Sequence, residues 1–258
     1  MTLTANDENP ALVERLVSRR VLVVDDDHDL ADATADALRE IGYATTTAYD
    51  FEGAVERAGE FAADVAVLDI RLGAEDGVEL IEVLRERRPK ILCILVTGHA
   101  DTHSAVRALR GGAYDYLYKP VEIEMLHVVL DRCFDRLRLE AEKEAAELAL
   151  RESEARFRAV VNNSPTKIHI KDIEGRYTLI NPQVERPFGV SDEEGRGRTS
   201  HDLFPKEIAD AFMAHDREVA ESGETTEREE EFTLEDGVHT FLTVKFPIYS
   251  EGSVIAVG

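Results

Sequence analysis

The stretch VLVVDDD at Val21–Asp27 decides the fold expected for the first half of the chain. Four apolar residues run directly into three aspartates, which is typical of a buried strand whose carboxyl end carries functional side chains. Short apolar runs of this kind recur along the chain, separated by segments with helical periodicity. Because such an alternation builds parallel sheets with helices on both faces, we predict an α/β fold with a five-stranded, parallel, doubly wound sheet.

The two patterns place the elements of this sheet along the chain. The expected strands are Val21–Val24, Ala44–Ala48, Val65–Asp69, Ile91–Thr97 and Tyr114–Tyr118. The expected helices are Leu30–Ile41, Phe51–Gly59, Val78–Arg87, Ser104–Arg110 and Glu122–Leu137.

Length and composition limit what the protein can be. A chain of 258 residues exceeds one average domain, so we expect two compact units and a connector. A net charge of −23, from 30 Lys and Arg against 53 Asp and Glu, argues against direct binding to nucleic acid or an anionic membrane. No apolar run has the length of a membrane span and no secretory signal is visible, so we expect a cytoplasmic protein. Cys93 and Cys133 lack metal-ligand neighbours and are expected to be buried thiols.

Charged and hydroxyl side chains gather where the predicted strands end. Asp25, Asp26 and Asp69 would repel one another unless a cation lies among them, and Mg²⁺ prefers such oxygen ligands. An aspartate carboxylate is a competent nucleophile toward phosphorus when an ammonium and a hydroxyl group stabilise the transferring phosphoryl group. The sequence therefore predicts a Mg²⁺ site at which Asp69 accepts a phosphoryl group beside Thr97 and Lys119.

Four strings carry these residues: VLVVDDD (Val21–Asp27), VLDIRLGAEDG (Val67–Gly77), LVTGHAD (Leu95–Asp101) and YDYLYKP (Tyr114–Pro120). In this order and at these strand ends, they resemble the receiver domain of two-component response regulators, which has a flavodoxin-like fold. The resemblance covers nearly half of the chain. It implies that Asp69 takes a phosphoryl group from a phosphohistidine on a sensor histidine kinase or a phosphotransfer protein.

The resemblance also implies a ligand set for the metal ion. Asp25, Asp26, Asp69 and the backbone carbonyl of Arg71 would hold Mg²⁺, with Asp25 acting largely through water. One departure from the family pattern is Gly73, which stands where many receivers have proline. We expect it to loosen that loop without abolishing the chemistry.

Two further residues are implied to act as a switch. Thr97 and Lys119 would bind the phosphoryl oxygens. In the family, the aromatic residue at the position of Tyr116 turns inward when the threonine moves. Phosphorylation would then shift the population of a pre-existing conformation.

A long helix is expected to follow, because no glycine or proline interrupts the chain between Pro120 and Pro165. Its apolar positions recur at three- and four-residue steps: Leu126, Leu130, Cys133, Leu137, Ala141, Ala145 and Leu148. This spacing favours a paired, coiled-coil helix. A single solvated connector helix stays open as the alternative.

From about Glu154 onward, short alternating segments separated by turns predict an α+β domain with an antiparallel sheet. The expected strands are Lys167–Ile170, Tyr177–Ile180, Thr226–Leu234, His239–Tyr249 and Val254–Val257. The segment Ile168–Pro205 is similar to PAS sensor domains, especially those that precede histidine kinases or cyclases. The resemblance implies a core that holds a cofactor, a small metabolite or nothing, so the PAS ligand stays unknown.

The residue types exclude or disfavour some of the ligands that a PAS core could hold. No cysteine follows Cys133, which excludes a flavin–cysteine adduct. Four histidines are expected to be surface or core residues rather than haem ligands: His169, His201, His215 and His239. Three basic residues are expected on a solvated strand face rather than at an acidic ligand: Lys167, Lys171 and Arg176.

These expectations divide the chain into an N-terminal extension at 1–19, a receiver domain at 20–137, a helical linker at 138–155 and a PAS domain at 156–258.

The leading hypothesis is phosphorelay signalling, in which the receiver transmits a conformational change through the linker to a PAS sensor or dimerisation module, within a homodimer. The alternative is the regulatory part of a larger hybrid histidine kinase or nucleotide cyclase, because the chain ends beside its last expected strand. No separate catalytic domain is visible, which limits catalysis to phosphoryl acceptance and autodephosphorylation at Asp69.

Overall fold

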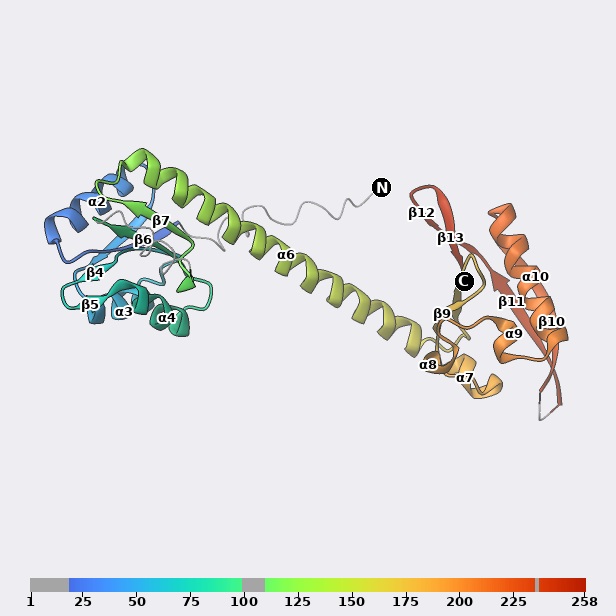
Figure 1. Cartoon of the computed structure of the whole chain (residues 1–258). Helices are drawn as coiled ribbons and strands as arrows, with labels where there is room; N and C mark the ends of the chain where they lie inside the picture. The colour runs from blue at the N-terminus through green and yellow to red at the C-terminus, as the bar shows by residue number, and fades with distance from the viewer. Residues whose placement is uncertain (1–18, 99–109, 235–236) are drawn as a thin grey trace. The chain divides into compact units, whose positions relative to one another are not determined.

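The computed structural model describes residues 19–98, 110–234 and 237–258. The chain divides into two compact units, Met1–Leu148 and Ala149–Gly258, with the boundary inside one long helix (Figure 1). Three expectations lie wholly or largely outside the described residues: the N-terminal extension, the end of the LVTGHAD string and the helix at Ser104–Arg110. No helix in the described ranges is long and apolar enough to cross a membrane.

The first unit contains the five-stranded parallel sheet that the sequence predicts. Its strands are β1 (Arg20–Val24), β2 (Ala44–Ala48), β3 (Val65–Asp69), β6 (Leu92–Thr97) and β7 (Asp115–Tyr118). Their order across the sheet is β2-β1-β3-β6-β7, and every neighbouring pair is parallel. The prediction of a doubly wound α/β fold is thus confirmed.

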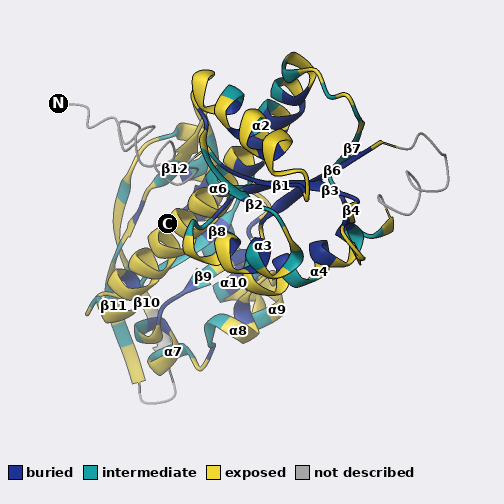
Figure 2. Ribbon diagram, turned by 90° about the vertical axis from the view of Figure 1, so that its left-hand side faces the viewer, coloured by how far each residue is buried: buried dark blue, intermediate teal, exposed yellow. Residues whose placement is uncertain are grey.

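Helices cover both faces of this sheet because alternate strand residues point to opposite sides. The helices are α2 (His28–Glu40), α3 (Phe51–Glu60), α4 (Gly77–Arg87) and α6 (Ile123–Asn163). Leu22, Leu68 and Leu95 pack in one core cluster with residues of α3 and α4. Val23, Val67 and Ile94 pack in the other with residues of α2 and α6. Every residue of β3 and β6 is buried, and Figure 2 shows the central strands buried beneath helices with exposed outer faces.

The loop after β3 turns back tightly into α4. Residues Arg71–Leu72 (β4) and Glu75–Asp76 (β5) form a small antiparallel pair, and the Asp76 side chain caps α4 by accepting from the Val78 N–H at 2.9 Å. The Gly77 N–H then donates to the Ile70 carbonyl at 2.8 Å. This approach is so close that a Cβ atom at position 77 would lie 2.0 Å from the Asp69 carbonyl oxygen. Only glycine fits there.

The long helix α6 begins where the sequence predicts and runs for 41 residues. Four of its seven expected pairing positions are instead part of the first unit's core: Leu126, Leu130, Cys133 and Leu137. Ala145 and Leu148 are exposed. The apolar spacing in the first half of α6 therefore reflects packing against the sheet.

The second unit has the predicted antiparallel α+β architecture. Its strands are β8 (His169–Asp172), β9 (Tyr177–Ile180), β10 (Thr226–Leu234), β11 (Gly237–Lys245), β12 (Pro247–Ser250) and β13 (Ser253–Val257). Its helices are α7 (Pro182–Phe188), α8 (Asp192–Gly195), α9 (Ser200–Leu203) and α10 (Lys206–Ser222). β12, β13, β8 and β9 form one sheet in that order, and β10 pairs with β11.

One predicted strand is wrong in detail. The expected single strand at His239–Tyr249 is divided at Phe246 into β11 and β12. The chain changes partner there, because β11 pairs with β10 whereas β12 pairs with β13. The Phe246 N–H and carbonyl both bond to Gly258, and Pro247 has no N–H to donate.

The close approach at Gly77 generates a stability prediction. Gly77→Ala should lower the free energy of unfolding by about 1–3 kcal/mol, because the added methyl group overlaps the backbone of Asp69. Urea denaturation of the full chain, followed by circular dichroism, measures this change.

Gly59→Ala in α3 is the matched control. Position 59 has no atom within 4 Å of an added Cβ, so alanine should stabilise the helix by up to about 1 kcal/mol. Equal effects of the two substitutions would contradict the steric argument.

Candidate functional site

Three carboxylates meet at the carboxyl edge of the parallel sheet. Asp25 follows β1 and Asp69 ends β3, and these strands are neighbours in the sheet. Asp25, Asp26 and Asp69 each place a carboxylate oxygen within 4.8 Å of the others. Asp25 and Asp69 are buried, whereas Asp26 is exposed. The structure therefore brings together the carboxylates that the sequence analysis singled out.

Lys119 supplies the opposite charge from the end of β7. Its Nζ donates to Asp25 Oδ2 at 2.6 Å and to Asp69 Oδ2 at 2.5 Å. Burial lowers the pKa of Lys119, but the hydrogen bonds to the two aspartates outweigh this and raise it above its usual value. For Asp25, burial has the opposite effect and raises the pKa. The hydrogen bond from Lys119 only partly opposes this shift. The ammonium group thus partly compensates the carboxylate cluster.

Backbone N–H groups fix the orientation of the carboxylates. The Arg71 N–H donates to Asp69 Oδ1 at 3.1 Å. The Asp27 N–H donates to Asp25 Oδ1 at 3.1 Å, and the Gly73 N–H donates to Asp26 Oδ2 at 3.1 Å. The loops after β1 and β3 therefore hold the carboxylates without using further cationic side chains.

The third aspartate of the VLVVDDD string has a different place. Asp27 is the N-cap of α2, and its side chain accepts from the Leu30 N–H at 3.1 Å. It is exposed. This agrees with a capping function for Asp27.

The two expected switch residues lie on the neighbouring strands. Thr97 is buried at the end of β6, and its carbonyl accepts from the Lys119 N–H at 2.7 Å. Tyr116 lies in β7, packs against the core cluster shared with α3 and α4, and meets the Tyr118 ring edge-on at 5.1 Å. Asp69, Thr97 and Lys119 thus converge on one edge of the sheet.

The donor set of this edge suits a hard divalent cation. Carboxylate oxygens are the ligands that Mg²⁺ takes in protein sites, and Asp25, Asp26 and Asp69 can supply them. In the structure an ammonium group, that of Lys119, is bound to two of the three carboxylates. A cation is therefore accommodated at this position, which fits the expected metal.

The second unit contains a buried charge cluster that the sequence analysis did not find. Lys171 and Lys245 are each 1% exposed and both form ion pairs with Asp216, which lies on α10. The Lys171 Nζ also donates to Ser200 Oγ at 2.8 Å. The expectation that Lys171 lies on a solvated strand face is therefore wrong. The available signal was Asp216 itself, a carboxylate at helical spacing from the buried Ala209 and Val219.

The four histidines of this unit are spread over surface and interior. His201 is exposed and pairs with Asp210 at 2.8 Å. His215 is 2% exposed and its ring nitrogens bond to Thr226 Oγ1 at 2.7 Å and Glu230 Oε1 at 3.1 Å. His239 is exposed.

The chain is similar to curated regulatory proteins over part of its length. The nitrogen assimilation regulatory protein NtrX of Azorhizobium caulinodans is 33% identical over 124 residues, which is 47% of this chain and 27% of the relative. The C4-dicarboxylate transport transcriptional regulatory protein DctD of Pseudomonas aeruginosa is 32% identical over 189 residues, 71% of this chain and 40% of the relative. The chain thus spans less than half the length of these relatives.

A solved structure and two family models are also similar to parts of the chain. The CheY-like receiver domain protein from Methanospirillum hungatei is 33% identical with a TM-score of 0.44, covering 48% of this chain and 97% of that chain. Residues 21–131 match the response regulator receiver domain, and residues 161–258 match the PAS fold. The chain therefore consists of a domain of the response regulator receiver family followed by a domain of the PAS-fold family.

Proposed function

We propose that this protein acts in phosphorelay signalling and that Asp69 is the phosphoacceptor. The main support for this proposal is the pair of short hydrogen bonds that Lys119 donates to Asp25 and Asp69 within a cluster of three carboxylates. An ammonium group beside a nucleophilic carboxylate is what phosphoryl transfer to aspartate requires.

The reaction follows from this geometry. A carboxylate oxygen of Asp69 attacks the phosphorus of a phosphohistidine on a sensor histidine kinase or phosphotransfer protein. The new P–O bond forms as the P–N bond breaks, and the departing imidazole nitrogen takes up a proton. Lys119 and the hydroxyl group of Thr97 bind the phosphoryl oxygens, which lowers the energy of the charged transition state.

Asp25, Asp26, Asp69 and the backbone carbonyl of Arg71 would hold Mg²⁺. The ion neutralises negative charge on the carboxylates and on the incoming phosphoryl group. Lys119 shares that task, because its ammonium group already binds two of these carboxylates.

The output is a conformational change that passes along α6 to the PAS domain, which acts as a sensor or dimerisation module. Thr97 and Tyr116 are the switch residues, since they lie on the adjacent strands β6 and β7, and β6 is the neighbour of the strand that carries Asp69. We place the protein in the cytoplasm, where histidine kinases present their phosphohistidine. The relatives described above are named as regulatory proteins. Their names do not favour the alternative that this chain is the regulatory part of a histidine kinase or nucleotide cyclase.

The protein forms a homodimer through α6 in this proposal. Beyond the core-packed turns, α6 exposes a stripe of large apolar side chains: Leu139 at 58%, Leu150 at 60%, Phe157 at 49% and Val160 at 69%. Their separations of 11, 7 and 3 residues fit a 3.5-residue repeat. An exposed apolar stripe with this period is what a second, parallel helix would cover. It differs from the pairing positions expected from the sequence.

Phosphoryl acceptance is tested by intact mass after incubation with Mg²⁺ and acetyl phosphate. The wild-type chain should gain the mass of one phosphoryl group, and Asp69→Asn should gain none, because its amide is not a nucleophile toward phosphorus.

Asp27→Asn is the matched control, since asparagine keeps the helix cap while removing one nearby carboxylate. It should be phosphorylated like the wild type. An Asp69→Asn chain that gains a phosphoryl group, or a wild type that gains none from acetyl phosphate or a kinase, would contradict the assignment.

Dimerisation is tested by light scattering after size-exclusion chromatography. Leu150→Glu should raise the dimer dissociation constant at least about tenfold, because pairing would bury an unpaired carboxylate. Ala149→Glu, at a neighbouring exposed position off the stripe, should leave it nearly unchanged. If both substitutions have the same effect, the stripe is not the interface.

A further inference from the structure

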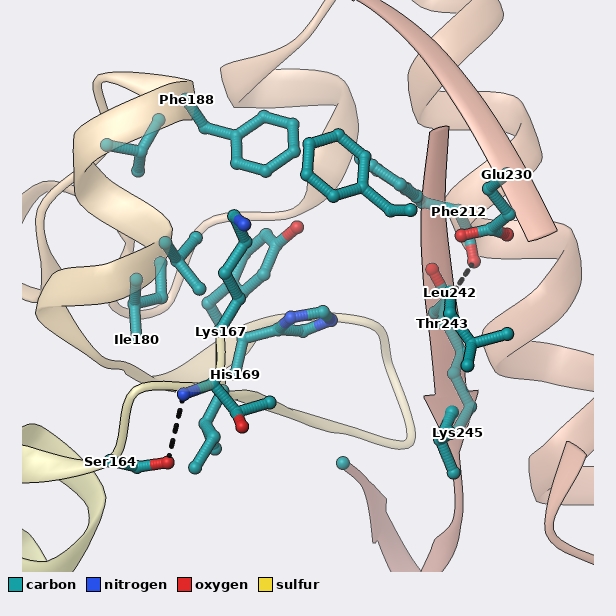
Figure 3. A pocket seen from close by; sticks show the side chains of 18 of the residues that line it. Ser164, Lys167, His169, Ile180, Phe188, Phe212, Glu230, Leu242, Thr243 and Lys245 are labelled. Carbon is teal, nitrogen blue, oxygen red and sulfur yellow. Dashed lines mark hydrogen bonds between the residues drawn. The ribbon is translucent and has the colours of Figure 1, made fainter. Parts of the chain in front are cut away.

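The PAS domain contains a cavity of about 560 Å³. Its wall is formed by the segment before β8, by β9 and α7 on one side, and by α10, β10 and β11 on the other (Figure 3). Small-molecule sites in proteins have volumes of about 300–1,000 Å³, so this space suffices for a ligand with one or two rings.

Aromatic side chains make up much of the wall. The aromatic lining residues are Tyr177, Phe188, Phe204, Phe212, Phe241 and Phe246. Phe188 meets Phe204 and Phe241 at centroid distances of 6.0 Å each, and Phe204 meets Phe212 at 5.7 Å. These rings offer faces and edges on several sides of the space, which favours a flat aromatic ligand over a flexible polar one.

Three lysines of this domain differ in whether a carboxylate binds them. Lys171 and Lys245 share the single carboxylate of Asp216, and Glu230 on the wall binds His215. Lys167 also lines the cavity, with its Nζ 4.6 Å from the centre of the Phe241 ring. No carboxylate of another described residue forms an ion pair with Lys167. Lys167 is an exposed residue, and of these three lysines it is the one whose ammonium group no carboxylate of the described residues binds, which leaves it available to an anion in the cavity.

His169 adds a neutral hydrogen-bonding group beside Lys167. Figure 3 shows both side chains reaching into the cavity from the same segment. Burial, and then the charges of Lys171 and Lys245, lower the pKa of His169 to about 3, so its ring is neutral at physiological pH. Neither ring nitrogen has a hydrogen bond to another described residue; the ring instead meets Tyr177 edge-on at 5.6 Å. A neutral imidazole offers one N–H donor and one acceptor to a ligand.

We propose that this cavity binds a small aromatic monocarboxylate, whose ring lies among the phenylalanines and whose carboxylate lies between Lys167 and His169. This inference deepens the sensor role proposed for the PAS domain. Lys167 supplies the charge and the His169 N–H supplies a hydrogen bond. Glu230 stands on the opposite wall, so a second carboxylate on the far side of the ring would be repelled.

The test is a calorimetric titration of the full unphosphorylated chain, without Mg²⁺ or a phosphodonor, so that it is independent of phosphorylation at Asp69. The probe is 1-naphthylacetate. Three compounds are compared with it. 1-Naphthaleneacetamide lacks the negative charge, and 1-(1-naphthyl)ethylamine carries a positive charge instead. Acetate keeps the carboxylate but lacks the aromatic ring.

The carboxylate should bind at least about tenfold more tightly than the amide, because a charge-assisted hydrogen bond and an ion pair are lost. The amine and acetate should show no saturable binding up to about 5 mM. Lys167→Met should reduce the preference for carboxylate over amide to less than about threefold, while binding of the amide persists. His169→Phe, which keeps a ring beside Tyr177, should weaken the carboxylate selectively.

Lys206→Met is the matched control. Lys206 is exposed, pairs with Asp210 and does not line the cavity, so its removal should leave all four affinities unchanged. Equal affinities for carboxylate and amide in the wild type, tighter binding of the amine, or no saturable binding of 1-naphthylacetate would overturn the proposal. The four affinities of the wild-type chain decide between these outcomes even if a variant fails to fold.

Discussion

Repulsion among three carboxylates at one sheet edge is the constraint on which the receiver site depends. A parallel sheet brings the carboxyl ends of β1 and β3 side by side, so Asp25 and Asp69 cannot separate without breaking strand pairing. Lys119, directly after β7, compensates part of this charge through its bonds to both carboxylates. The same group is the one that, in our proposal, binds the phosphoryl oxygens.

Local pattern was sufficient to predict the receiver fold and to bring the candidate residues together. Apolar runs that end in charged residues locate strands and their functional ends at once, as Val21–Asp27 illustrates. Long-range partners were not predictable in this way. Strand alternation suggested a solvated Lys171, yet its partner Asp216 lies 45 residues away on a helix. Apolar spacing in α6 could not distinguish packing against the sheet, as at Leu130, from pairing with another helix.

The PAS domain and the receiver differ in the sign of the charges that they gather: the receiver places one lysine among three carboxylates, and the PAS domain places two lysines around one carboxylate. It buries Lys171 and Lys245 around one carboxylate, where breaking the network by removing Asp216 would leave two ammonium groups unpaired. In a chain with a net charge of −23, this domain also places Lys167 beside an aromatic cavity.

Competition between Lys119 and a divalent cation for the same carboxylates is the central claim about the receiver. Calorimetric titration with Mg²⁺ of the wild type and of Lys119→Met tests it most directly. The wild type should bind one Mg²⁺, and the variant should bind it more tightly, by up to about tenfold, because the competing ammonium group is gone. Failure of the wild type to bind Mg²⁺, or an affinity of Lys119→Met equal to or weaker than that of the wild type, would contradict the account.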